Sequence, residues 1–155
     1  MKTLVDSSAL YALTIAEDLH HDRAVTCFGE LDQLGVELST TNYVLLECVA
    51  LIQRRYGMSD AQEFLKKVGA LLDIVWIGQT EHGEAVKMWT AAGRRALSLV
   101  DCTNMAVMRQ RHIRTIVAFD PHFHEAGFEV LPRADRVAEG RGVYRTKPLS
   151  KRVAR

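Results

Sequence analysis

The segment Thr115-Ile116-Val117-Ala118-Phe119-Asp120 is a short apolar run that ends in an acid, and Thr3-Leu4-Val5-Asp6 repeats this pattern near the amino terminus. We predict a strand in each segment, with the aspartate emerging at its carboxyl end. Residues 36–40, 74–77 and 128–131 also have the composition of short strands. Helical segments separate these strands. This alternation predicts one α/β domain with a mostly parallel sheet and right-handed crossovers.

Capping residues set the expected helix boundaries. Asn42 is expected to cap the helix that follows it, Ser59 and Gln62 match a capping box, and Ser98 caps the last long helix. The expected helices cover residues 9–17, 22–34, 43–57, 60–72, 80–94 and 100–111.

Four acidic residues lie at separate places where burial of a carboxylate is energetically unfavourable: Asp6, Glu47, Asp101 and Asp120. Glu47 lies inside the apolar segment 43–52, where a buried ionised carboxylate needs a partner. A solvated glutamate or a salt bridge to an arginine is the alternative there. The aspartates also have ordinary explanations, as a helix cap, a capping-box member after Ser98, and a turn residue before Pro121.

The combination of the acids is more informative than each alone. Two of them end strands, and open α/β sheets bind ligands beyond the carboxyl ends of their strands. Mg²⁺ and Mn²⁺ prefer oxygen ligands from a few carboxylates, with water and substrate phosphate completing the shell. The sequence therefore predicts a site for a hard divalent cation.

With these acids in this order, the chain resembles the PIN-domain ribonucleases over most of residues 2–132, and among them the VapC toxins of toxin–antitoxin pairs. The resemblance depends on the order and spacing of short motifs rather than on any single motif. These motifs are Val5-Asp6-Ser7-Ser8-Ala9-Leu10, Glu47 in its apolar helix, Leu97-Ser98-Leu99-Val100-Asp101-Cys102-Thr103, and Phe119-Asp120-Pro121-His122-Phe123.

The resemblance implies a single PIN-like α/β domain, with a five-stranded parallel sheet of order 3-2-1-4-5 and helices on both faces. It implies that Asp6, Glu47, Asp101 and Asp120 bind one or two Mg²⁺ or Mn²⁺ ions, with Ser7 and Thr103 as supporting hydrogen-bonding residues. The implied activity is metal-dependent hydrolysis of RNA phosphodiester bonds by an endoribonuclease that leaves 5′-phosphate ends. A small antitoxin and a homodimer are the implied partners besides RNA.

Charge is unevenly distributed along the 155 residues. Residues 133–155 hold eight Lys and Arg against two Asp and Glu, whereas the rest of the chain holds twelve against seventeen. We therefore expect a nuclease domain over residues 1–132 and a basic, flexible tail over 133–155. The tail has two interpretations, an RNA-binding arm or a solvated extension.

Three cysteines without metal-ligand spacing indicate reduced core thiols, and we expect neither a signal peptide nor a membrane span. These features favour a cytoplasmic location. Trp76 and Trp89 are expected in the core or at an interface, and His122 on the surface of a turn, with a role near the scissile phosphate as the less favoured alternative.

Some arginines at expected helix ends are candidates for contact with the RNA backbone, although helix-terminal arginines also serve the helix dipole. They are Arg54, Arg55, Arg94 and Arg95.

Three rival functions share some of these features. A haloacid-dehalogenase-like phosphatase needs a second acid two residues after Asp6, where this chain has Ser8. A receiver-like module needs paired acids before the first helix, which are missing. A catalytically idle PIN fold that only binds RNA or a partner remains the alternative, and the intact set of four acids argues against it.

Overall fold

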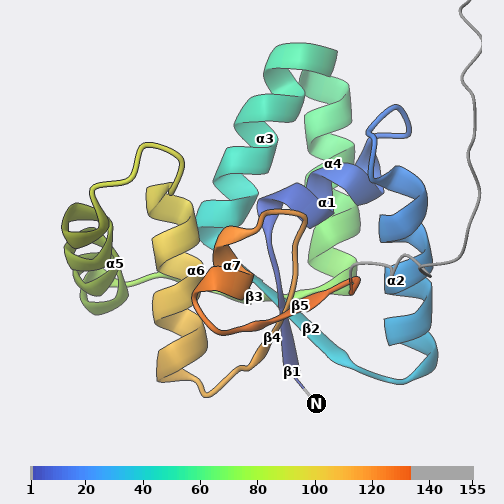
Figure 1. Ribbon diagram of the computed structural model, residues 1–155. Helices are drawn as coiled ribbons and strands as arrows, with labels where there is room; N and C mark the ends of the chain where they lie inside the picture. The colour runs from blue at the N-terminus through green and yellow to red at the C-terminus, as the bar shows by residue number, and fades with distance from the viewer. Residues whose placement is uncertain (1, 134–155) are drawn as a thin grey trace, which may run out of the picture.

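Five parallel strands form the centre of the protein in a computed structural model, which describes residues 2–133. The strands are β1 (Lys2–Val5), β2 (Glu37–Thr41), β3 (Asp73–Val75), β4 (Thr115–Val117) and β5 (Glu129–Leu131). They pair in the order β3-β2-β1-β4-β5 (Figure 1), so the predicted sheet is confirmed. Each strand runs parallel to its neighbours.

Helices cover both faces of this sheet. One face carries α1 (Ser7–Thr14), α2 (His21–Gln33), α3 (Asn42–Tyr56) and α4 (Met58–Leu71), and the other carries α5 (Gln79–Ala92), α6 (Leu99–Gln110) and α7 (His122–Glu125) (Figure 1). Because side chains alternate along a strand, neighbouring residues enter different cores. Val5 and Val117 pack beneath α1 to α4, whereas Leu4 and Ile116 pack beneath α5 to α7.

Two predicted helix caps are wrong. Thr41, not Asn42, caps α3, since its hydroxyl accepts a hydrogen bond from the Val44 backbone N–H at 3.2 Å. The capping box at Ser59 does not form either. Gly57, at φ +102°, ends α3 and leads directly into α4, which places Ser59 inside the first turn rather than in the extended position that a cap requires.

The three cysteines, Cys27, Cys48 and Cys102, are free and buried, as predicted. Trp76 and Trp89 are 73% and 47% exposed, which excludes the core and leaves the interface as the remaining prediction for both. None of the helices within residues 2–133 is both long and apolar enough to cross a bilayer. The predicted tail lies outside the described residues from position 134 onward.

Candidate active site

The carboxyl ends of β1 and β4 meet in the middle of the sheet. Val5 pairs with Val117, and the backbone N–H of Asp6 donates to the Val117 carbonyl at 2.9 Å. From β1 the sheet extends through β2 to β3 on one side, and from β4 it extends to β5 on the other. The strand order therefore reverses between β1 and β4. Such a switch point leaves a crevice beyond the strand ends, and Asp6 and Asp120 flank it.

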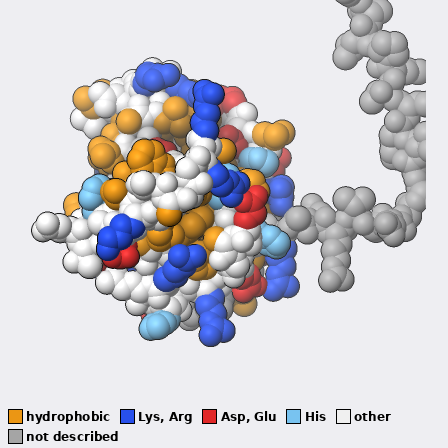
Figure 2. Space-filling view, turned by 60° about the vertical axis from the view of Figure 1, so that its left-hand side comes forward, with side chains coloured by type: hydrophobic (Ala, Val, Ile, Leu, Met, Phe, Trp, Pro, Cys, Tyr) orange, Lys and Arg blue, Asp and Glu red, His pale blue; other side chains and the backbone are white. Residues whose placement is uncertain are grey.

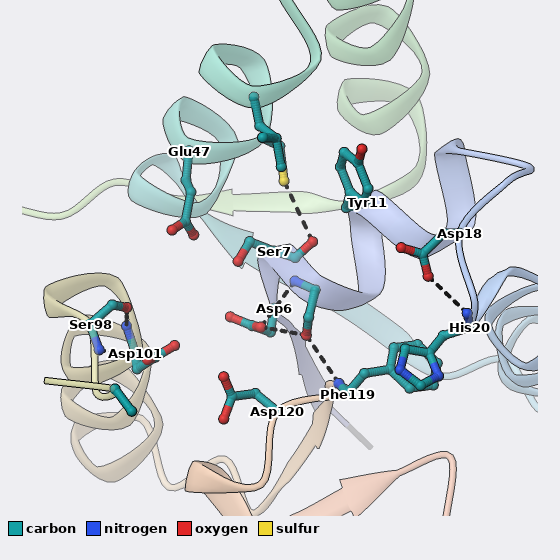
Figure 3. A pocket seen from close by; sticks show the side chains of 14 residues that line it. Asp6, Ser7, Tyr11, Asp18, His20, Glu47, Ser98, Asp101, Phe119 and Asp120 are labelled. Atoms are coloured by element: carbon teal, nitrogen blue, oxygen red, sulfur yellow. Dashed lines mark hydrogen bonds between the residues drawn. The ribbon is translucent and has the colours of Figure 1, made fainter. Parts of the chain in front are cut away.

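A hollow of about 400 Å³ occupies this crevice, and all four predicted acids line it (Figure 3). Asp6 and Asp101 are only 2% and 7% exposed, and Asp120 is half-buried. Glu47 is exposed to solvent at the hollow, which makes its predicted burial wrong. α3 buries the stripe formed by Val44, Cys48 and Ile52, and Glu47 lies beside that stripe rather than on it.

Buried hydrogen bonds hold Asp6 in place. Its Oδ2 accepts from the Ser8 backbone N–H at 3.1 Å and from the Ser8 hydroxyl at 2.7 Å, and its Oδ1 accepts from the Asn104 amide at 2.9 Å. The Ser8 hydroxyl also accepts from the Phe119 backbone N–H at 3.0 Å, which ties the end of β1 to the segment after β4. The pKa of Asp6 is raised from 3.8 to about 6, because burial outweighs the hydrogen bonds from Ser8, which lower it, and the charge of Asp101 contributes to the rise.

Asp101 is fixed by the predicted capping box at the start of α6. The Ser98 hydroxyl accepts from the Asp101 N–H at 3.0 Å, and Asp101 Oδ2 accepts from the Ser98 N–H at 2.8 Å. Burial raises the pKa of Asp101, the hydrogen bonds to Ser98 lower it, and the charge of Asp120 raises it. The carboxylates therefore repel one another, which is the condition that a bound cation relieves.

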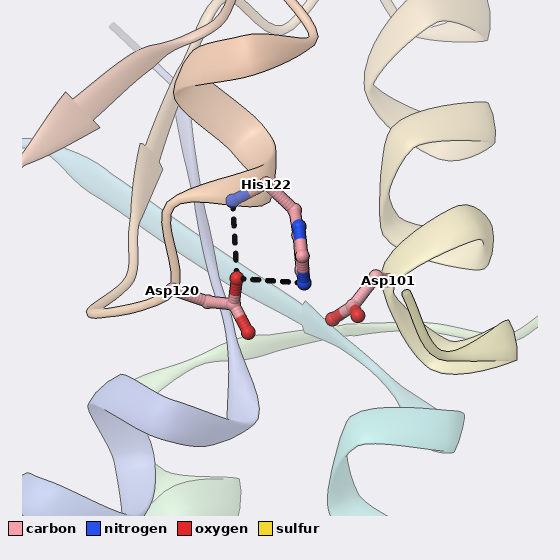
Figure 4. A group of neighbouring side chains, drawn as sticks. All are labelled: Asp101, Asp120 and His122. Atoms are coloured by element: carbon pink, nitrogen blue, oxygen red, sulfur yellow. Dashed lines mark hydrogen bonds and ion pairs between the residues drawn. The ribbon is translucent and has the colours of Figure 1, made fainter. Parts of the chain in front are cut away.

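His122 belongs to this cluster, and its predicted position on a turn surface is wrong. It is 8% exposed, and its Nε2 lies 2.9 Å from the Ala96 carbonyl oxygen and 3.4 Å from Asp120 Oδ1 (Figure 4). Its backbone N–H donates to the same Asp120 oxygen at 3.0 Å. Contact with a carbonyl oxygen requires a hydrogen on Nε2, so the ring orients Asp120 and ties it to the loop before α6.

The donor set suits a hard divalent cation. Ligand atoms of Asp101, Asp120 and His122 lie within 4.8 Å of one another, although the Nε2 hydrogen of His122 leaves the carboxylates as the better donors. Within the described residues, Asp120 Oδ2, Asp101 Oδ1 and the Glu47 carboxylate accept no hydrogen bond, and these oxygens remain available for coordination. Such an arrangement of oxygen ligands fits Mg²⁺ or Mn²⁺.

Comparison with known proteins agrees with this geometry. A family model described as the PIN domain matches residues 3–129. The chain belongs to the PIN-domain family. It is 33% identical over 135 residues to the 23S rRNA-specific endonuclease VapC20 of Mycobacterium tuberculosis, an alignment that covers 83% of this chain and 97% of the relative. The predicted resemblance to VapC ribonucleases is confirmed.

Solved structures show the same fold. The crystal structure of Mycobacterium tuberculosis VapC20, described as a sarcin–ricin loop cleaving toxin, superposes with a TM-score of 0.74 at 28% identity, over 81% of this chain and 95% of that one. VapBC2 from Rickettsia felis, bound to a promoter DNA fragment, gives 0.64 at 13% identity over 84% and 97%. FitAcB from Neisseria gonorrhoeae gives 0.59 at 13% identity over 84% and 96%.

The two predicted supporting hydroxyls of this PIN domain lie in different places. Ser7 lines the hollow, but Thr103 is fully buried in α6 and donates to the Leu99 carbonyl at 2.8 Å, away from the acids. Ser8 and Asn104, neither of which was predicted as a supporting residue, make the hydrogen bonds to Asp6 instead. Asn104 lies one helical turn after Asp101, a spacing that places both residues near one face of α6.

The candidate RNA-contacting arginines also differ from one another. Arg55 donates to the hydroxyl of Tyr11, a residue of the hollow, at 3.0 Å, whereas Arg94 forms an ion pair with Glu125 at 2.8 Å. Arg54 and Arg95 are exposed, and Arg95 adjoins Ala96 at the edge of the hollow. Arg55 and Arg95 are therefore the two of these arginines that contact or adjoin residues lining the hollow.

Proposed function

We propose that this PIN domain is a divalent-cation-dependent endoribonuclease and the toxin of a toxin–antitoxin pair. The observation that carries the proposal is the gathering of four carboxylates, from four separate segments of the chain, in one hollow at the switch point of the sheet. Two of them are buried beside each other with raised pKa values, an arrangement that disfavours the cation-free state.

In this proposal Asp6, Glu47, Asp101 and Asp120 hold one or two Mg²⁺ or Mn²⁺ ions. When bound, such an ion neutralises charge on the phosphodiester and lowers the pKa of water. Asp6, fixed by Ser8 and Asn104, supplies a rigid anchor at the base of the hollow. The exposed carboxylate of Glu47 is the residue best placed to accept a proton from the attacking water, because no hydrogen bond within residues 2–133 engages it.

The proposed substrate is structured RNA. The Mycobacterium tuberculosis relative is specific for 23S rRNA and cleaves the sarcin–ricin loop, so that hairpin is the first RNA to test for this chain. An RNA pool that contains transfer, ribosomal and messenger RNA reveals any other target. Cleavage by an activated water is expected to leave a 5′-phosphate and a 3′-hydroxyl.

Two protein partners complete the proposal. A small antitoxin covers the acidic hollow and places an arginine among the carboxylates, which would replace the charge of the cation. Figure 2 brings the side with α5 forward and shows hydrophobic side chains in the middle of that face, bordered by Lys and Arg. Trp76 and Trp89, both exposed, provide apolar area for a homodimer.

We also propose that the nuclease domain ends near residue 132 and that residues 133–155 form a separate basic tail. The family match ends at residue 129 and the last strand at Leu131, which supports that boundary. A chain truncated after Arg133 is expected to keep its cleavage activity. If the tail is an RNA-binding arm, the truncation raises KM and flattens the salt dependence without changing kcat.

RNA cleavage tests the central proposal. The purified chain, Asp120→Asn and the exposed control Asp73→Asn are incubated with the RNA pool in Mg²⁺, Mn²⁺ or EDTA, and product ends are mapped. We expect cation-dependent cutting by the wild type and by Asp73→Asn, and none by Asp120→Asn. Equal activity of Asp120→Asn contradicts the assigned site. RNA binding without cleavage by the wild type identifies a catalytically idle binding module instead.

A further inference from the structure

A second hollow of about 550 Å³ adjoins the acidic one and shares three residues with it, His20, Phe119 and Asp120. Asp120 therefore faces both hollows. A polynucleotide chain whose phosphate lies at the acids can continue directly into this adjoining hollow. Arg23, Glu129 and Arg133 are among the other residues that line the second hollow.

Stacked aromatic rings form the wall between the two hollows. The rings of His20 and Phe119 are parallel within 3°, with their centroids 4.4 Å apart, and both residues are half-buried (Figure 3). The guanidinium carbon of Arg23 lies 5.5 Å from the centroid of Phe119. Proteins that bind single-stranded nucleic acid combine these groups, because bases stack on aromatic faces and on guanidinium planes.

The wall is held firmly against the acids. The Phe119 backbone N–H donates to the Ser8 hydroxyl at 3.0 Å, and that hydroxyl donates to Asp6. On the other side, the His20 backbone N–H donates to Asp18 Oδ1 at 2.8 Å. A base that stacks on this wall is thereby placed in a fixed position relative to the carboxylates.

Charge in the second hollow favours a phosphate near Arg23. Arg133 is neutralised by Glu129 at 2.7 Å, whereas Arg23 forms no ion pair within residues 2–133 and only a 3.4 Å hydrogen bond to the Arg133 carbonyl. Arg23 is exposed. The exposed guanidinium of Arg23 can pair with a phosphate, and the aromatic wall beside it can stack on a base.

We propose that the second hollow is the binding subsite for an unpaired nucleotide adjacent to the scissile phosphate. Its base stacks on a face of the His20–Phe119 pair that the other ring does not cover, and its phosphate pairs with Arg23. The inference rests on the proposed ribonuclease function and adds to it the residues that hold an unpaired base beside the scissile phosphate. A base inside a duplex does not reach such a wall.

RNA binding, measured separately from cleavage, tests this subsite. All binding is measured in the Asp101→Asn background, which prevents cutting, by fluorescence anisotropy of a labelled unpaired RNA. Phe119→Leu removes the ring and keeps most of the volume, and Phe119→Tyr keeps the aromatic face. We expect Phe119→Leu to weaken binding by about tenfold and Phe119→Tyr to leave it within about twofold, as the loss of one stacked base predicts.

Abasic RNA separates stacking from a structural effect. On a matched strand in which every nucleotide is abasic, the proposal predicts equal affinity for the parent, Phe119→Leu and Phe119→Tyr. Equal affinity of all three for intact RNA overturns the subsite, as does a Phe119→Leu defect that persists on abasic RNA. Failure of the wild-type chain to cleave RNA overturns the proposed function instead, and the binding data still decide the subsite.

Discussion

Replacing Asp6 with asparagine is expected to stabilise the cation-free protein at about pH 7 while it abolishes cleavage. In the folded protein the pKa of Asp6 is raised from 3.8 to about 6, mainly by burial and also by the charge of Asp101. A difference of about two pH units corresponds to roughly 3 kcal/mol by which ionised Asp6 disfavours folding. A bound cation, or a neutral side chain at position 6, would remove this penalty.

The sign follows from the two pKa values. Unfolded Asp6 loses its proton near its ordinary value of 3.8 and folded Asp6 near 6, so the folded state binds more protons between these values. The cation-free protein therefore loses stability as pH rises from about 4 to about 6 and stays less stable above that range. Asp101, whose pKa is also raised, contributes a slope of the same sign in both proteins.

Asparagine removes the charge but loses part of the hydrogen bonding. Asp6 accepts bonds from Ser8 on one oxygen and from Asn104 on the other, and an amide NH₂ group replaces one of these acceptors. Leaving one donor unsatisfied costs about 1–2 kcal/mol. The net expectation is a gain of about 1–2 kcal/mol in the free energy of unfolding for Asp6→Asn in EDTA at about pH 7.

Urea denaturation in EDTA between about pH 4 and about pH 8 measures this difference. The wild type is expected to lose stability with rising pH more steeply than Asp6→Asn, and Mg²⁺ is expected to stabilise the wild type more than the variant. The exposed control Asp73→Asn should follow the wild type. If Asp6→Asn is less stable than the wild type at about pH 7, or if both pH profiles are parallel, the assigned burial effect is wrong.

Four further changes separate the roles of individual residues. Glu47→Gln is expected to abolish cleavage and to change the free energy of unfolding by less than about 0.5 kcal/mol, because Glu47 is exposed. A large loss of stability in urea denaturation would contradict the exposed position of Glu47. Asn104→Ala leaves the buried Asp6 short of a donor and should destabilise the fold by about 1–3 kcal/mol, as thermal and urea unfolding will show. His122→Leu should weaken Mn²⁺ affinity by about tenfold, because Asp120 loses the ring that orients it, and His122→Gln should weaken it less. An Mn²⁺ affinity of His122→Leu equal to that of the wild type in titration calorimetry would refute the positioning role. Arg94→Ala breaks an exposed ion pair and should cost less than about 1 kcal/mol, with KM for RNA unchanged, whereas a raised KM would reveal a phosphate contact.

The strands and three of the acids were predictable because local patterns specify them. Asp6 and Asp120 each follow a short apolar run, and parallel strands bring such ends to one edge of a sheet. The Ser98 capping box fixes Asp101 at the start of α6 through contacts only three residues apart. The strand order, by contrast, came from the resemblance to PIN domains rather than from these patterns.

Other features depend on packing that local patterns leave undetermined. Residues 43–52 are apolar on nearly every side of the helix, so their helical period does not identify the buried stripe. Glu47 was therefore predicted to be buried, whereas it lies on the exposed side of α3. His122 enters the cluster through its contact with the carbonyl of Ala96, a residue 26 positions away. Asn104 did have a usable signal, because it lies one turn after Asp101 on a helix whose other buried residues are mostly apolar.

Equilibrium binding of Mn²⁺, measured by electron paramagnetic resonance, tests the central claim most directly, namely that these carboxylates form one cation site. The wild type and Asp73→Asn are expected to bind Mn²⁺ with equal affinity, and Asp101→Asn to bind it at least about tenfold more weakly with its fold intact. Equal Mn²⁺ affinity in Asp101→Asn and the wild type, or a folded wild type that binds no Mn²⁺, would contradict the account.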